Sequence, residues 1–172
     1  MAAHLGQDDG RAPNIKRPGT RMPIENKILS PAPLAYRRFS GHVTMAELTA
    51  SSQALHADPA YVPGTHTVVD MLDVTDFDIG FDQMRDFAAL TRNRHSARGK
   101  PVHIFIVCSS EQGRWLAEMF RALADLEPGL ANIDILHGFP DVLAILDLPP
   151  DTIKLFPEDC QIESHLFTRR SS

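Results

Sequence analysis

The stretch from Thr67 to Met84 constrains the fold more than any other part of the chain. It begins with a run of valines and other apolar residues, continues through several aspartates, and leads into a helical apolar pattern. A continuous apolar run without strict alternation is typical of a strand that is buried on both faces. A buried strand followed by a helix is the repeating unit of parallel sheets. The stretch therefore predicts an α/β fold with this strand near its centre.

The same succession of strand and helix recurs along the chain. Strands are expected over Asn26–Leu29, Leu34–Phe39, His66–Leu72, Val102–Cys108 and Asn132–Leu136. Helices are expected from a capping box at Thr44 to about His56, over Phe81–His95, after Ser109 as a cap, and over Pro140–Leu146. The close spacing of the first two strands predicts an antiparallel hairpin. The order β-β-α-β-α-β-α-β-α predicts a mixed, mostly parallel sheet of about five strands flanked by helices.

The length of 172 residues suits one domain with tails. Residues 1–22 are polar, basic and rich in Gly and Pro, which predicts a disordered N-terminal tail. Residues 23–148 form the predicted domain, and Pro149-Pro150 marks its edge. Residues 149–172 form a C-terminal tail that is partly docked or flexible, since it keeps apolar residues such as Phe156.

Composition excludes several classes of protein. A net charge of −5 argues against a nucleic-acid-binding module, which would carry a basic face. Two cysteines make no disulfide framework. No apolar run reaches the roughly 20 residues that span a bilayer, and the N-terminus has no apolar leader, so we expect a cytoplasmic protein. The chain has no Gly-rich phosphate loop, so we expect no cofactor.

The aspartates that follow the central strand are candidate metal ligands. Asp73, Asp76 and Asp78 lie beyond its carboxyl end, where ligands bind in open α/β sheets. Carboxylates there could hold Mg²⁺ or Ca²⁺. Their spacing fits neither an EF-hand nor an aspartyl phosphotransferase, however. We favour the alternative that Asp78 caps the next helix while Asp73 and Asp76 shape a turn.

A second candidate is the C-x5-R pattern of Cys108 to Arg114, the spacing of cysteine phosphatases. That chemistry needs a thiolate and an arginine around a loop of backbone amides that cradles phosphate. Glu111 would place a negative charge in that cradle, and Ser109 looks like a helix cap. Whether residues 109–113 form a loop or a helix distinguishes a phosphatase from a buried, inert thiol.

The order of several short motifs resembles the SpoIIAA-like (STAS/SEC14-type) bacterial domain family of the STAS superfamily, over about Ile24 to Asp147. The matching stretches are Tyr36–Leu48, Asp58–Gly64, Val68–Gly80, Trp115–Phe120 and Phe139–Leu146. The resemblance implies a single small STAS-like domain that binds a protein partner. Related antagonists of anti-sigma factors are switched by phosphorylation of a serine, and Ile79 stands about where that serine would be. The resemblance to SEC14-like domains implies a second possibility, an apolar cavity for a lipid-like ligand.

The leading hypothesis is a non-catalytic interaction or regulatory module without the serine phosphoswitch. We expect its partner-binding surface at Phe77, Asp78, Ile79 and Phe81, because this predicted loop is more apolar than contact with solvent alone explains. The occupant is a protein partner or a second copy of the chain, for example in a homodimer. A carrier of a small apolar ligand and a phosphatase using Cys108 and Arg114 are the alternatives.

Overall fold

The structure is a computed structural model that describes residues 24–126 and 131–161. The tail expected at residues 1–22 and the last part of the C-terminal tail, from residue 162, lie outside the described residues. The strands are β1 (Ile24–Ile28), β2 (Leu34–Thr44), β3 (His66–Asp78), β4 (His103–Val107) and β5 (Asn132–Leu136). The helices are α1 (Met45–Ala57), α2 (Phe81–Arg98), α3 (Glu111–Asp125), α4 (Phe139–Ile145) and the 3-10 helix η1 (Pro150–Leu155). The predicted order of strands and helices is confirmed.

The strands form one five-stranded sheet in the order β1-β2-β3-β4-β5. β1 pairs antiparallel with β2, and the other three pairings are parallel. The predicted mixed, mostly parallel sheet and its N-terminal hairpin are therefore confirmed. β3 occupies the middle of the sheet, as expected for its apolar sequence.

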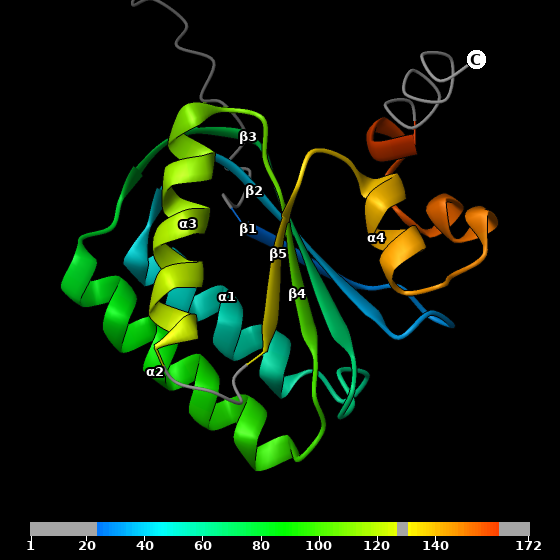
Figure 1. The fold of residues 1–172 in the computed structure, drawn as a ribbon, viewed down its shortest axis with the longest axis horizontal. Coiled ribbons are helices and arrows are strands. Elements are labelled where there is room, and N and C mark those ends of the chain that lie inside the picture. Colours follow the sequence, from blue (N-terminus) through cyan, green and yellow to red (C-terminus); the bar gives the residue numbers. More distant parts are fainter. Residues whose placement is uncertain (1–23, 127–130, 162–172) are drawn as a thin grey trace, which may run out of the picture.

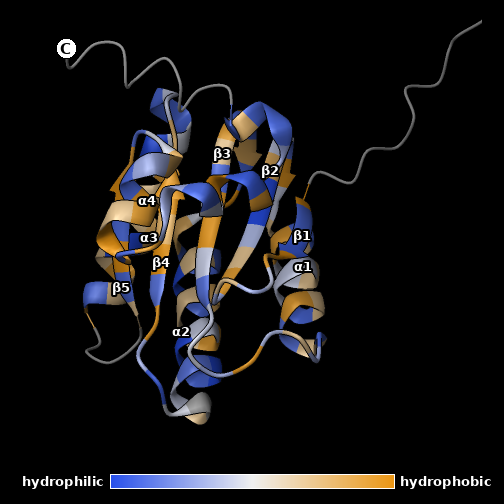
Figure 2. Cartoon of the chain, turned by 90° about the vertical axis from the view of Figure 1, so that its right-hand side faces the viewer, coloured by the Kyte–Doolittle hydropathy of each residue, from blue (hydrophilic) through white to orange (hydrophobic). Residues whose placement is uncertain are grey.

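Helices cover both faces of the sheet. Figure 1 shows α1, α2 and α3 on one side and α4 with the C-terminal segment on the other. Neighbouring residues of β3 therefore enter different cores: Val69 packs in the cluster under α1–α3, and Val68 packs in the cluster under α4. Figure 2 shows the hydrophobic colouring of the inner strands between these layers. Burial of β3 on both faces, predicted from its continuous apolar run, is confirmed for residues 67–71.

β2 and β3 are longer than predicted. β3 pairs with β4 only from Thr67 to Asp70, but it pairs with β2 as far as Thr44↔Asp78. The aspartates expected in a loop therefore lie in a strand, a correction to the sequence prediction. Aspartate is depleted in strands, yet the backbone partner in β2 and the burial of Val74 outweigh that preference here. The register shifts twice along this extension, once next to Gly41, whose φ of 66° suits glycine.

The observed helix caps agree only in part with those predicted from the sequence. The capping box at Thr44 forms: the backbone N–H of Glu47 donates to the Thr44 hydroxyl, and the Thr44 N–H donates to the Glu47 carboxylate. The N-cap of α2 is Gly80 and not Asp78, with the Gly80 N–H donating to Gln83 Oε1 at 2.8 Å. The N-cap of α3 is Ser110 and not Ser109. Both errors follow from strand and turn lengths that local sequence does not set.

The described part of the C-terminal tail packs on the sheet. Phe156 and Cys160 are 2% and 3% exposed and join the core cluster formed with α4. The ring of Phe156 meets that of Tyr36 from β2 at 5.7 Å between centroids. This segment therefore completes the cover of the second face of the sheet.

A large-to-small substitution tests this two-layer core. Phe105 in β4 is fully buried, so Phe105→Ala should lower the free energy of unfolding by about 3–5 kcal/mol through lost burial and a cavity. Phe81 is 58% exposed, and Phe81→Ala should change that free energy by about 0.5 kcal/mol or less. Urea denaturation of both variants measures the difference. Equal losses from the two variants would contradict the packing.

Candidate functional site

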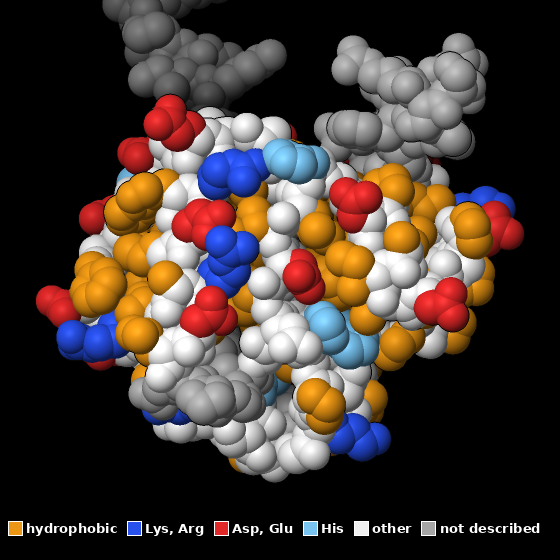
Figure 3. Space-filling view, in the orientation of Figure 1, with side chains coloured by type: hydrophobic (Ala, Val, Ile, Leu, Met, Phe, Trp, Pro, Cys, Tyr) orange, Lys and Arg blue, Asp and Glu red, His pale blue; other side chains and the backbone are white. Residues whose placement is uncertain are grey.

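The carboxyl end of β3 presents three aromatic side chains, Phe77, Phe81 and Trp115, which we call the aromatic surface. The rings of Phe77 and Trp115 stack with centroids 5.5 Å apart and an angle of 9° between planes. Trp115 is 54% exposed in the first turns of α3, and Phe81 is 58% exposed at the start of α2. Figure 3 shows hydrophobic side chains gathered on the left of the molecule, where β3 leads into α2.

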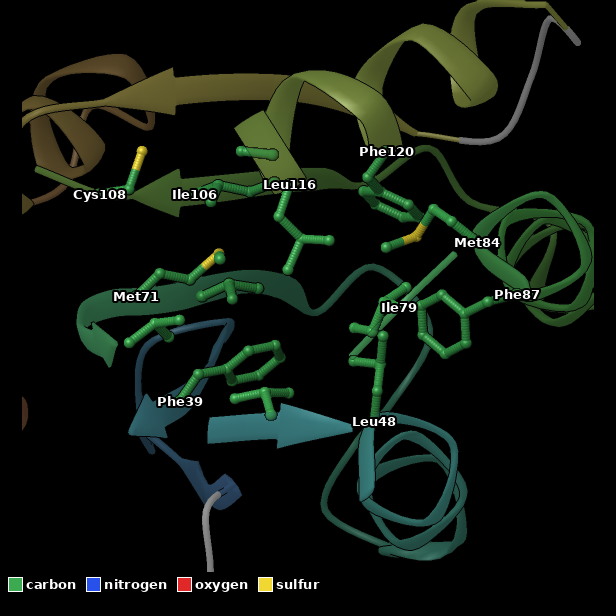
Figure 4. Close-up of a cluster of buried hydrophobic side chains, with 14 of the residues drawn as sticks. Phe39, Leu48, Met71, Ile79, Met84, Phe87, Ile106, Cys108, Leu116 and Phe120 are labelled. Carbon is green, nitrogen blue, oxygen red and sulfur yellow. The ribbon is translucent and has the colours of Figure 1, made fainter. Parts of the chain in front are cut away.

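The four residues expected to bind a partner do not all lie on this surface. Phe81 and Asp78 are exposed and Phe77 is half-buried, but Ile79 is only 6% exposed and packs in the core with Met84 and Phe87. The expected exposed apolar loop is therefore wrong for Ile79, because β3 continues to Asp78 and turns the next side chain inward. Figure 4 shows Ile79 pointing into this cluster.

Trp115 is the residue that sequence reasoning missed, since it was considered only as part of the stretch Trp115–Phe120. A usable signal was its place on α3: it falls outside the buried face formed by Leu116, Phe120 and Leu123. A large aromatic residue beside an otherwise regular apolar face is a reason to expect surface contact.

The border of the aromatic surface is acidic. Asp76, Asp78, Asp82 and Asp86 are all exposed. Arg85 partly compensates this charge, with its guanidinium 2.9 Å from Asp82 and 3.5 Å from Asp86. Asp76 lies 3.3 Å from the imidazole of His42. Four carboxylates against one arginine leave this part of the surface negatively charged.

The metal site considered for Asp73, Asp76 and Asp78 is not formed. Asp73 accepts a hydrogen bond from the guanidinium of Arg38, whereas Asp76 faces His42. Within residues 24–126 and 131–161, no group of three or more His, Cys, Asp or Glu side chains is arranged to hold a metal ion. The aspartates are spaced along an extended strand, and Arg38 and His42 on β2 pair with two of them. The three carboxylates therefore do not converge on one metal ion.

The phosphate cradle considered for Cys108 to Arg114 is also not formed, because α3 begins at Glu111. The Gly113 N–H donates to Ser110 Oγ and the Arg114 N–H to the Ser110 carbonyl, both at 3.0 Å, so these amides are occupied. Cys108 is fully buried, and burial raises the pKa of its thiol. Arg114 points toward His137, with 3.4 Å between the guanidinium and the imidazole nitrogens.

A buried polar network lies on the opposite face of β3, and sequence reasoning missed it. The hydroxyl of Tyr36 donates to the carboxylate of Asp70, which also accepts the Leu72 N–H at 3.0 Å. Cys160 Sγ lies 3.3 Å from the same hydroxyl. Burial raises the pKa of Asp70, although the hydrogen bond from Tyr36 opposes that shift. Burial also raises the pKa of Cys160 to about 12, so its thiol is protonated at neutral pH.

Beside this network is a polar pocket of about 130 Å³, lined by Arg38, Asp70, Leu72, Asp73, Asp159 and Cys160. The guanidinium of Arg38 bridges Asp73 of β3 and Asp159 of the C-terminal segment. Arg38 on β2 is thus paired with one carboxylate on β3 and with one on the C-terminal segment. The arrangement therefore docks the C-terminal segment on the sheet and explains why Asp159 and Cys160 lie there.

The apolar layer between the sheet and α1–α3 contains a cavity of about 60 Å³. Pockets for drug-sized ligands have volumes of about 300–1,000 Å³. A lipid-like ligand, the alternative that the sequence resemblance implied, does not fit a cavity of this size.

No family model matches the chain, and no curated protein matches it. A solved structure from Shewanella loihica PV-4, described as an uncharacterized protein of the DUF3478 family with a SpoIIAA-like fold, is similar in structure. That similarity covers 72% of this chain and 91% of the other, at 12% sequence identity and a TM-score of 0.47. The fold named in its description is the one that the sequence resembles.

No helix in the described part of the chain is long and apolar enough to cross a membrane.

The raised pKa of Asp70 predicts a pH dependence of stability. A carboxyl group whose pKa is raised by folding stabilises the folded state fully below its unfolded pKa of about 3.9, and this contribution is lost as pH rises through the folded pKa. Asp70→Asn cannot ionise, so its free energy of unfolding relative to wild type should increase as the pH rises above about 3.9 and through the folded pKa of Asp70. Urea denaturation at several pH values measures this difference.

Asp125→Asn is the matched control, since Asp125 is exposed at the end of α3 and meets water whether the chain is folded or unfolded. If Asp70→Asn changed the free energy of unfolding by the same amount at every pH, the burial of an ionisable Asp70 would be contradicted.

Proposed function

We propose that this chain is a non-catalytic, STAS-like regulatory module that binds a protein partner through the aromatic surface. The observation that carries the proposal is the stack of Phe77 on Trp115, with Trp115 and Phe81 each more than half exposed. Exposed aromatic groups of this kind mark interaction sites in soluble proteins. Tryptophan is also among the residues that most often dominate the energy of a protein interface.

The geometry supports tight contact at Trp115 in particular. Its ring lies flat against Phe77, whose own side chain is half-buried at the end of β3. A side chain held in one orientation loses less conformational entropy on binding than a free one. Trp115 is therefore a preorganised anchor for a pocket or an apolar patch on a partner.

Charge favours a different protein over a second copy of this chain. A twofold homodimer would bring the carboxylates of Asp78 and Asp82 toward the same carboxylates of the partner subunit, and like charges oppose such contact. A partner with an apolar centre and a basic border would match the surface. We therefore propose a basic protein surface as the occupant.

The buried position of Ile79 supports regulation without a phosphoswitch at this point. Ile79 stands about where the resemblance places a switch serine, and its side chain packs against Met84 and Phe87. No hydroxyl is present there to accept phosphate. Binding is then controlled by the concentration or the conformational state of the partner.

Site-specific crosslinking followed by affinity measurement tests the proposal. Gln112 is exposed one turn before Trp115 on α3, so a photoreactive phenylalanine at Gln112 should crosslink the partner in the native host. The same group at Val62, which is 54% exposed, is the control position. With the purified partner, Trp115→Ala should weaken binding at least about tenfold, as expected for an aromatic anchor.

The acidic border adds a second readout, because affinity should fall as the salt concentration rises. Asp82→Asn should reduce that salt dependence, whereas Val62→Ala should change neither affinity nor salt dependence. A partner that crosslinks equally from Gln112 and Val62, or that binds Trp115→Ala as well as wild type, would refute the proposal. A homodimer that Trp115→Ala converts to monomer would also refute it, since the occupant would be a second copy.

A further inference from the structure

The cavity under α1–α3 is separate from the aromatic surface and has its own chemistry. Most of its wall is apolar, and Figure 4 shows Phe39 and Leu48 facing Leu116 and Phe120 across this layer, with Phe87 beside them. Its volume of about 60 Å³ gives room for about four to six water-sized atoms, at about 10–15 Å³ for each. The cavity therefore suits a small molecule and not a lipid.

One end of the cavity is polar. The polar residues in its lining are Arg37, Ser52, His56, Tyr61, Thr67, Thr91 and His95. The hydroxyl of Tyr61 lies 3.2 Å from Thr67 Oγ1. The ring of His56 lies 5.1 Å from that of Tyr61 and 5.5 Å from that of His95. Since Thr67 is the second residue of β3, this end lies at the amino end of the strand, opposite the aromatic surface.

Arg37 brings a positive charge to this end. It is 7% exposed, and its guanidinium donates to two neutral oxygens, Asn26 Oδ1 at 3.2 Å and Ser51 Oγ at 3.0 Å. Its third contact is the ring of Phe39, at 5.3 Å. None of these contacts is a carboxylate. Within residues 24–126 and 131–161, no carboxylate is paired with Arg37, and burial lowers the pKa of this side chain to about 10. A buried charge without a counter-ion is costly.

Two further donors lie at the same end. Thr91 on α2 is 6% exposed, and its hydroxyl has no hydrogen-bond partner among the residues that the structure describes. Buried hydroxyls are nearly always hydrogen-bonded, so this one points to a group that the chain does not supply. Arg94 reaches Ser52 of the lining, with its guanidinium donating to Ser52 Oγ at 2.9 Å. Cationic and hydroxyl donors thus surround one end of an otherwise apolar cavity.

From this arrangement we infer that the cavity binds a small aliphatic monocarboxylate. Arg37 is the counter-ion of the carboxylate, and the Thr91 hydroxyl is a second hydrogen-bond donor to it. The alkyl group lies against the apolar wall formed by residues such as Met71, Met84 and Leu116. The binding site is separate from the proposed protein-binding surface, because Phe77, Phe81 and Trp115 do not line the cavity.

The apolar wall of the cavity favours a monocarboxylate over inorganic phosphate. Inorganic phosphate carries its charge and hydrogen-bonding oxygens on every side, so it would leave several of them against hydrocarbon. A monocarboxylate is charged at one end and apolar at the other, which matches the cavity. The volume limits the alkyl group to a few carbon atoms.

Methyl NMR of the full chain labelled at methionine with butyrate as the probe tests the inference. Met71 and Met84 line the cavity, whereas Met45 and Met119 do not, so the last two are internal controls. Butyrate should shift the Met71 and Met84 signals selectively, with a Kd of about 0.1–10 mM because few heavy atoms limit the affinity. Butyramide has the same size and no charge, and its affinity should be at least about tenfold weaker.

Two variants test the assigned donors. Arg37→Met should weaken butyrate binding by about 10–100-fold, as expected for a charged hydrogen bond. Thr91→Val has nearly the same shape and removes a hydroxyl without a partner, so it should fold as wild type does and still bind butyrate more weakly. Arg121→Met, which removes a partly exposed guanidinium from α3, should bind butyrate like wild type.

The inference is overturned if butyrate leaves Met71 and Met84 unshifted, if butyramide binds as well as butyrate, or if inorganic phosphate shifts these signals and butyrate does not. It is overturned equally if Thr91→Val binds butyrate like wild type. None of these results bears on the aromatic surface, whose test does not involve butyrate.

Discussion

The burial of β3 on both faces is the constraint on which the rest of the structure depends. Its side chains alternate between two cores, so each face of the sheet needs its own apolar cover. The helices α1–α3 cover one face. On the other face α4 has only seven residues, and the C-terminal segment adds Phe156 and Cys160. The domain therefore uses residues beyond α4 to complete a core, and the Tyr36–Asp70–Cys160 network lies where that segment docks.

Unequal strand lengths create the aromatic surface. β4 ends at Val107, where it pairs with Asp70, but β3 continues to Asp78 along β2. The chain leaving β4 turns directly into α3, and the extended end of β3 reaches the first turns of that helix. The Phe77–Trp115 stack forms at this contact. Leu116, the neighbour of Trp115, also lines the cavity, so α3 forms part of both proposed sites.

Periodic features of the sequence predicted a large part of the fold. Apolar runs and helical spacing indicated the elements and their order, and the Thr44 capping box located the start of α1. The same reasoning failed where local preference and tertiary context disagree. Asp73, Asp76 and Asp78 are typical of turns, yet pairing with β2 holds them in a strand. Ile79, expected in an exposed loop, is buried, and the exposure of Trp115 was not predicted.

The sequence by itself determined the α/β class, the N-terminal hairpin and the central place of β3, because these follow from local patterns of period two and 3.6 residues. Only the tertiary structure decided which polar residues are buried and which aromatic residues are exposed. Arginine is usually exposed, and nothing near Arg37 in the sequence shows that β1 and α1 enclose it. Burial depends on contacts between residues far apart in the chain, so the donors of the cavity and the stack on Trp115 appear only once the layers are assembled.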